Sequence, residues 1–163
     1  MRERKASGTG AIVITFLLAG WLAILPLPDA LALGRPEWLT LVLIYWVIAL
    51  PHRVGVFWGF GAGLFQDVLT GSVLGQHAVA LSVVAYIALA MHKRLRVFLP
   101  LQQVVVVFLL VGTGSLLSYI VQNAVGRTLL PPVWVLLPAL VSALLWRPLF
   151  AVLRWVRHRF LVR

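Results

Sequence analysis

The sequence has no cysteine, few acidic residues and no long polar segment. The absence of cysteine excludes disulfides, iron–sulfur clusters and thiol catalysis. Only four of the 163 residues are acidic, against 14 lysines and arginines, which gives a formal net charge of +10. Because no polar segment is long enough to form a soluble domain, the hydrophobic residues, 62% of the chain, must determine its class.

Sequence signatures of catalysis and cofactor binding are also missing. The chain contains no HExxH, no GxSxG and no phosphate-cradling glycine loop. Its four histidines are predicted to lie on both sides of a membrane, with only His77 outside, which argues against a shared metal site. We therefore expect a protein that is not an enzyme, with no catalytic residue, no cofactor and no metal.

The basic residues are distributed unevenly between the apolar runs. Twelve of the 14 precede the first run or follow the second, fourth and sixth, whereas only Arg35 and Arg127 lie in the other gaps. Loops rich in lysine and arginine stay on the cytoplasmic side of polytopic membrane proteins. The alternation therefore predicts that both termini are cytoplasmic. The positive charge then sets topology and suits an anionic inner leaflet, and it does not indicate nucleic acid.

These runs predict an all-α integral membrane protein, a bundle of six transmembrane helices that forms one domain over residues 1–163. A span needs about 20 apolar residues to cross the hydrocarbon layer. The second and third runs are short and could instead form a re-entrant hairpin, although Arg53 at its tip favours two spans. The first run also resembles a signal peptide that could be cleaved. The expected spans are approximately residues 10–28, 37–51, 54–70, 76–91, 98–121 and 133–152.

Glycines and one acid recur every four residues in the third run. Gly55, Gly59, Gly63 and Asp67 should form one ridge on a helix, where small residues let another helix approach closely. Asp67 is the acid predicted within or at the edge of a span, so it is a functional candidate. It is either a polar anchor or ligand contact, or a capping acid at the outer helix end, where the helix dipole disfavours it. His77 could reach Asp67, but solvation is the more common state of an interfacial histidine.

Two further expectations concern side chains along the predicted spans. Tyr86 lies mid-span and is expected to pack between helices with a hydrogen-bond partner. The basic residues at the cytoplasmic ends are expected to contact the membrane surface or a cytoplasmic partner. Those after the fourth run should form an inner loop, and those after the sixth a basic tail. The residues in question are Arg53, Lys93, Arg94, Arg96, Arg154, Arg157 and Arg159.

Several motifs together resemble one bacterial family, the rod shape-determining protein MreD. The resemblance covers the whole chain, in length, six-span layout and the basic segment after the fourth span, but its specific part is the glycine–aspartate stretch. The motifs are Arg35-Pro36-Glu37-Trp38, Tyr45-Trp46, Pro51, Arg53, Gly55, Gly59-Phe60-Gly61-Ala62-Gly63-Leu64-Phe65-Gln66-Asp67, Gly71 and Leu74-Gly75-Gln76-His77-Ala78.

The resemblance implies a multi-pass subunit of the bacterial inner membrane. It implies membership of the elongasome, the complex that directs lateral peptidoglycan synthesis. It also implies association with MreC and, indirectly, with MreB and the RodA/penicillin-binding-protein synthase, besides membrane lipids. The family fold is similar to the six-helix substrate-binding subunits of vitamin transporters. Gly71 and Gly75 are expected to lie at a helix-packing or partner interface, together with the ridge formed by Gly55, Gly59, Gly63 and Asp67.

Two classes of function follow from this interpretation. The first is a non-catalytic scaffold that binds partner helices in the bilayer and helps MreC and MreB to maintain rod shape. The second is a substrate-binding membrane subunit of a small-molecule or lipid transporter. The scarcity of charges within the spans favours the scaffold, because polar solutes and coupling ions need polar contacts near the midplane.

Overall fold

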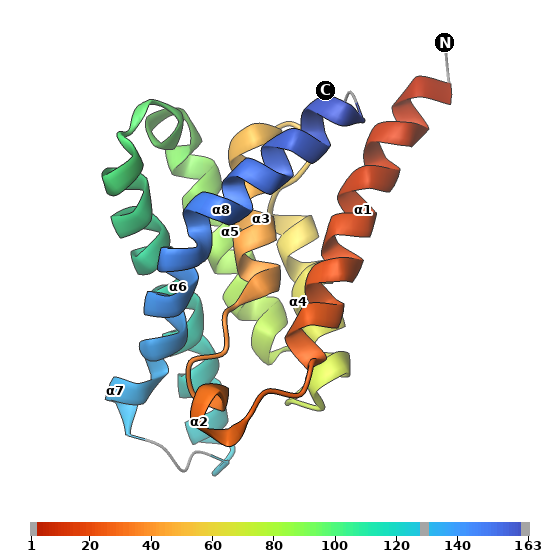
Figure 1. Cartoon of the computed structure of the whole chain (residues 1–163). Helices are drawn as coiled ribbons and strands as arrows, with labels where there is room; N and C mark the ends of the chain where they lie inside the picture. Colours follow the sequence, from red (N-terminus) through yellow and green to blue (C-terminus); the bar gives the residue numbers. More distant parts are fainter. Residues whose placement is uncertain (1–2, 128–130, 161–163) are drawn as a thin grey trace.

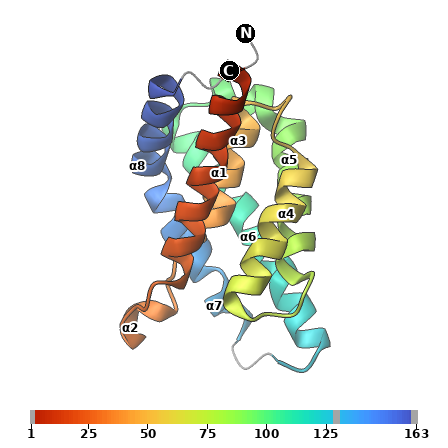
Figure 2. The same cartoon turned by 90° about the vertical axis from the view of Figure 1, so that its right-hand side faces the viewer.

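The structure, a computed structural model, describes residues 3–127 and 131–160, with side chains from residue 8 onward. Within these residues the chain is entirely helical, with no strand. Six longer helices run side by side, and two short ones lie at one end of the bundle (Figures 1 and 2). The helices are α1 (Glu3–Ile24), α2 (Asp29–Ala32), α3 (Trp38–Ala49), α4 (Val56–Thr70), α5 (Gln76–Val97), α6 (Pro100–Ala124), α7 (Pro132–Val135) and α8 (Leu137–Arg159).

The shortest of the six longer helices, α3, lies at the centre of the bundle. Its 12 residues are apolar on every side, and all but Trp38 are buried. A helix without a polar face is stable only when other elements surround it. Here α1, α4, α5, α6 and α8 all contact α3. The brevity of the second apolar run is thus explained, because α3 is enclosed by protein along its whole length.

The outer surface of the bundle is rich in large apolar side chains. Ile14, Trp21, Phe57, Val105 and Leu144 are each more than half exposed. Surfaces of this kind belong in lipid rather than in water. Three helices of the described chain, α5, α6 and the α7–α8 segment, are long and apolar enough to cross a membrane. The length of these helices and the apolar outer surface of the bundle together indicate a membrane protein.

The two ends of the bundle differ in charge. One end carries the start of α1, the α3–α4 turn, the α5–α6 junction and the end of α8 (Figures 1 and 2). Arg53, Arg94, Arg96 and Arg157 belong to these segments. The opposite end carries α2, the α4–α5 turn and α7. The basic segments that alternate along the sequence are therefore gathered at one end in space.

The helices extend beyond the expected runs at the basic end. The expected inner loop after the fourth run is wrong, since Lys93, Arg94 and Arg96 lie in the last turns of α5. Lysine and arginine are good helix formers, and their charge is favourable at a helix C-terminus. The basic tail is likewise helical, because α8 continues to Arg159 without a break at Pro148.

The prediction for Tyr86 is also wrong. Its side chain is 66% exposed and points out of the bundle, whereas Ala85, the preceding residue, is fully buried. Apolar residues cover most of α5, so the sequence alone does not define which side faces the other helices. The small residues Ala78, Ala85 and Ala88 form the buried side instead.

Candidate functional site

Two glycines of the ridge lie where α4 packs against α5. A Cβ atom on Gly59 would stand 2.6 Å from the carbonyl oxygen of Leu81, and one on Gly63 would overlap the backbone of His77 and Ala78. These obstacles are backbone atoms, which cannot move aside as a side chain could. The two helices therefore touch at backbone distance, and only glycine fits at Gly59 and Gly63.

The other three glycines that were expected at a helix-packing interface, Gly55, Gly71 and Gly75, lie elsewhere. Gly55 precedes α4, and a Cβ there would meet nothing closer than Leu89 at 3.9 Å. Gly71 and Gly75 have positive φ angles of 64° and 97° and bound the turn between α4 and α5, with open space at each Cβ position. Gly71 and Gly75 are therefore turn residues, which shape the backbone in a conformation that suits glycine.

Asp67 connects the end of α4 to the start of α5. Its Oδ1 accepts hydrogen bonds from the Ser72 hydroxyl (2.8 Å) and the His77 backbone N–H (3.0 Å), and lies 2.8 Å from His77 Nδ1. Its Oδ2 accepts from the Gly75 N–H (2.9 Å) and, at 3.4 Å, from the Ala78 N–H. Both carboxylate oxygens are thus occupied, and the residue is 1% exposed.

The arrangement resolves the conflict between Asp67 and the dipole of its own helix. Asp67 lies near the C-terminus of α4, but its carboxylate meets the free N–H groups at the N-terminus of α5. A negative charge is favourable at a helix N-terminus. Asp67 is therefore a cap supplied by one helix to the next. The expectation that His77 is merely solvated is wrong, because its ring contacts Asp67.

A second polar set at the same end was not predicted from the sequence. The Glu37 backbone N–H donates to Ser142 of α8 (2.9 Å), and the Glu37 carboxylate accepts from Gln66 of α4 (3.3 Å). Arg35 donates to the carbonyl oxygens of Ala23 and Leu25, so it covers the C-terminal end of α1. An arginine in the connection after a helix is a sequence signal for such capping.

The basic residues at the opposite end have two roles in the structure. Arg96 donates to the Ile48 and Ala49 carbonyl oxygens at the end of α3, at 2.9 and 3.1 Å. Arg53 donates to the Thr9 hydroxyl of α1 at 2.6 Å. These two residues therefore support the fold. The others are at most partly buried, with Arg157 intermediate and the following four exposed: Lys93, Arg94, Arg154 and Arg159.

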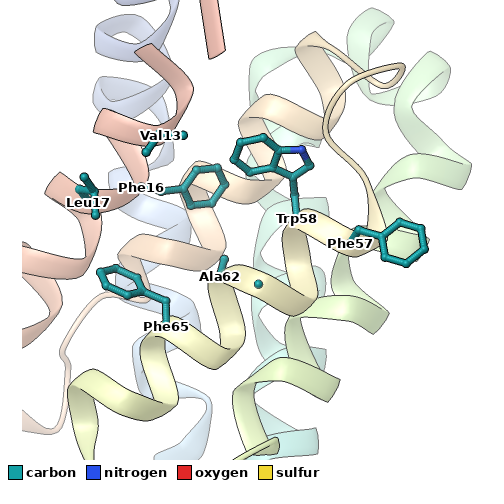
Figure 3. A pocket seen from close by; sticks show the side chains of 8 residues that line it. Val13, Phe16, Leu17, Phe57, Trp58, Ala62 and Phe65 are labelled. Carbon is teal, nitrogen blue, oxygen red and sulfur yellow. The ribbon is translucent and has the colours of Figure 1, made fainter. Parts of the chain in front are cut away.

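A groove runs between α1 and α4 (Figure 3). Its volume is about 350 Å³, and its lining is apolar. Phe16 and Trp58 point toward one another and stack with ring centroids 5.6 Å apart, whereas Phe57 points away from α1. Gly61 lies in the groove, and a Cβ there would meet nothing within 4 Å. The other lining residues are Val13, Leu17, Ala62 and Phe65.

The described residues contain no group of three or more histidine, cysteine or acidic side chains that could hold a metal ion. Three other features of the described residues are surfaces or packed clusters. These are the α4–α5 seam (Gly59, Gly63 and Asp67 against α5), the apolar groove and the basic end.

Comparison with known proteins decides the family. The family model described as rod shape-determining protein MreD matches residues 4–156, almost the whole chain. The chain belongs to the MreD family. A relative of the same description from Haemophilus influenzae (strain ATCC 51907 / DSM 11121 / KW20 / Rd) is 35% identical over 149 residues, which cover 91% of each chain. No solved structure matches the chain, so its expected likeness to transporter substrate-binding subunits stays a prediction.

Membership in the MreD family supports a role in determining rod cell shape. Family membership also agrees with the apolar outer surface and the long apolar helices, because all of these indicate a membrane protein. The match includes both the α4–α5 seam and the groove, because α4, α5 and every residue that lines the groove lie within residues 4–156.

Proposed function

We propose that this chain is a non-catalytic scaffold subunit of the elongasome in the bacterial inner membrane. In this role it receives the single membrane-spanning helix of MreC in the groove between α1 and α4. Through MreC it is linked to MreB and to the RodA/penicillin-binding-protein synthase, and so helps direct lateral peptidoglycan synthesis.

The observation that carries the proposal is the open space at Gly61. In lipid, helices associate through close packing, and small residues at the contact let their backbones approach. Gly59 and Gly63 already serve this purpose inside the bundle, whereas Gly61 faces outward in a groove with aromatic walls. A single apolar helix is the partner that suits an apolar groove on the lipid-facing side of a bundle.

The proposed topology has six spans with both termini in the cytoplasm. It is supported by the gathering of α1's start and α8's end at the basic end of the bundle (Figures 1 and 2). Reporter fusions after Arg96 and after Arg163 should read cytoplasmic, and a fusion after Arg127 should read periplasmic. A periplasmic reading after Arg96 would contradict the layout.

The groove is tested with a matched pair of substitutions. Gly61→Leu fills the groove, whereas Gly10→Leu adds the same side chain to α1 at a glycine that also has nothing within 4 Å of its Cβ position. Both changes are expected to leave the bundle folded. Recovery of MreC with the purified protein should fall for Gly61→Leu and remain normal for Gly10→Leu, and cells should round only with Gly61→Leu.

The result has two informative alternatives. Normal MreC recovery with Gly61→Leu, at equal protein level, would exclude the groove as the binding face. Loss of MreC with both variants would mean that the contact covers a broader part of the lipid-facing surface than the groove.

The transporter alternative rests on one buried side chain. Gln76, at the start of α5, is 1% exposed, and neither atom of its amide group has a hydrogen-bond partner among the described residues. A buried polar group of this kind is suited to a small polar ligand. A small molecule found by mass spectrometry in the purified protein, and absent from Gln76→Leu, would favour the transporter. Normal cell shape with failed solute uptake in Gln76→Leu would replace the scaffold altogether.

A further inference from the structure

A pocket at the basic end lies between the α5–α6 junction and the second half of α8. Its volume is about 650 Å³, and an adjoining cavity of about 380 Å³ shares several of its walls. Arg96, Arg147, Arg154 and His158 line the pocket, and Arg157 lines the adjoining cavity. Four arginines therefore line these two adjoining spaces.

No carboxylate lines either space. The acidic side chains that the structure describes are Asp29, Glu37 and Asp67, and their segments belong to the opposite end of the bundle (Figure 1). Positive charges that line one pocket repel one another, and an anion bound between them offsets that repulsion. The pocket also contains the start of α6 at Pro100, where the helix dipole adds to the positive potential.

The walls of the pocket are aromatic as well as basic. Phe98, Phe150 and Trp155 line it, and Trp155 is 63% exposed. Apolar side chains beside the pocket are also open, with Val97 80% exposed and Leu101 76% exposed. Arginine and tryptophan next to exposed aliphatic side chains are typical of the membrane–water interface. The pocket therefore lies at the level of lipid headgroups.

We propose that this basic pocket binds the phosphodiester headgroup of an anionic membrane lipid, such as phosphatidylglycerol or cardiolipin. The guanidinium groups of Arg147 and Arg154 hold the phosphate, since arginine donors match phosphate oxygens in pairs. The glycerol and acyl chains lie over Trp155 and the exposed aliphatic side chains. Arg96 has a different part, because its hydrogen bonds to the α3 carbonyl oxygens keep it in place at the wall.

The occupant is a lipid rather than an acidic protein segment because of what surrounds the charges. An acidic segment would be matched by a basic surface facing water, but here exposed aliphatic residues flank the pocket. Basic pockets between helices at the cytoplasmic side are known to bind anionic headgroups. Lipid binding at this pocket does not require any protein to bind the bundle elsewhere.

The experiment uses the full chain in detergent, where no charged leaflet contributes and only direct contacts count. A pocket variant, Arg147→Gln with Arg154→Gln, is compared with a control, Lys93→Gln with Arg94→Gln. Both remove two exposed positive charges near the same end, but only the first pair lines the pocket. Native mass spectrometry then measures binding of phosphatidylglycerol, phosphatidylethanolamine and soluble glycerol phosphate.

We expect wild-type protein to bind phosphatidylglycerol in preference to phosphatidylethanolamine and to retain no glycerol phosphate. The apparent Kd for phosphatidylglycerol should rise about tenfold or more in the pocket variant and less than about threefold in the control. Equal melting temperatures of the two variants show that folding is unaffected, and if the double variant fails to fold, Arg154→Gln alone replaces it.

Three outcomes would overturn the proposal. Equal weakening in pocket variant and control would mean that net charge, and not the pocket, attracts the lipid. Binding of glycerol phosphate as tight as that of phosphatidylglycerol would assign the site to a soluble phosphate compound. Unchanged lipid binding together with loss of a co-purified protein from the pocket variant would assign it to a protein segment.

Discussion

The helix α4 has glycines on two sides, and the two sides differ in what they contact. Gly59 and Gly63 lie against the backbone of α5, where no further atom fits. Gly61 lies between them in sequence and faces the groove beside α1, with nothing within 4 Å of its Cβ position. The same residue type therefore closes a contact within the bundle on one side and leaves space for another molecule on the other.

The polar groups make the same distinction. The α4–α5 seam ends in Asp67, whose two oxygens are both occupied by groups of the turn and of α5. The α1–α4 side has aromatic stacking between Phe16 and Trp58. Interhelical hydrogen bonds and backbone contact make the first seam rigid, whereas side-chain packing can adapt to a new neighbour. The predictions below test this difference, from the largest expected effect to the smallest.

The largest effect is expected for Gly63→Leu. The new side chain would overlap the backbone of His77 and Ala78, so α4 and α5 must separate. We expect a loss of more than about 3 kcal/mol, enough to prevent accumulation of folded protein. The yield of monodisperse protein in detergent is the measurement, with Gly61→Leu as the control that stays folded. Normal yield of Gly63→Leu would show that the seam is looser than described.

Asp67→Leu should have the next largest effect. It removes the acceptor of the Gly75, His77 and Ala78 N–H groups and leaves these buried or part-buried groups without a partner, at a cost of about 3 kcal/mol. Asp67→Asn should also destabilise, by about half as much, because its amide N–H₂ must face either the Gly75 or the His77 N–H. Thermal unfolding of both variants measures this. Wild-type stability of Asp67→Asn would mean that one carboxylate oxygen is dispensable.

A smaller effect is expected on the α1 side from Arg35→Gln. The change removes the charged hydrogen bonds to the Ala23 and Leu25 carbonyl oxygens and should cost about 1–2 kcal/mol. Hydrogen exchange should increase at the end of α1 and remain unchanged in α4 and α5. Increased exchange throughout α4 would show that the two sides of this helix are coupled.

The smallest effect is expected for Tyr86→Leu. Its side chain is 66% exposed on the outer side of α5. The free energy of unfolding, measured by thermal unfolding, should therefore change by less than about 0.5 kcal/mol. Ala85→Leu, one residue earlier and fully buried near Gly59, should instead destabilise strongly. Similar behaviour of the two variants would contradict the orientation of α5.

The sequence was sufficient for the helical class and for the spacing of the ridge, because apolar runs and a four-residue repeat are local patterns. It was insufficient to decide whether His77 reaches Asp67. That contact spans ten residues and depends on a turn whose shape comes from positive φ angles at Gly71 and Gly75. The same limit applies to Arg35, whose acceptors at the end of α1 lie twelve and ten residues earlier.

Helix orientation was the other feature that the sequence left undefined. A mid-span hydroxyl is expected to find a partner between helices, which predicts that Tyr86 faces inward, but α5 is apolar on nearly all sides. The central position of α3 was equally hidden, since a short apolar run is compatible with a re-entrant segment or with a helix enclosed by others. Only the packing of distant segments separates these possibilities.

The bond between Asp67 and His77 also bears on how the chain is made. Its partners are ten residues apart, so we expect the α4–α5 pair to close soon after translation has passed Val97. The contact of Glu37 with Ser142 joins residues 105 positions apart and must wait until α8 has left the ribosome. We therefore expect the α4–α5 hairpin to form before α8 completes the enclosure of α3.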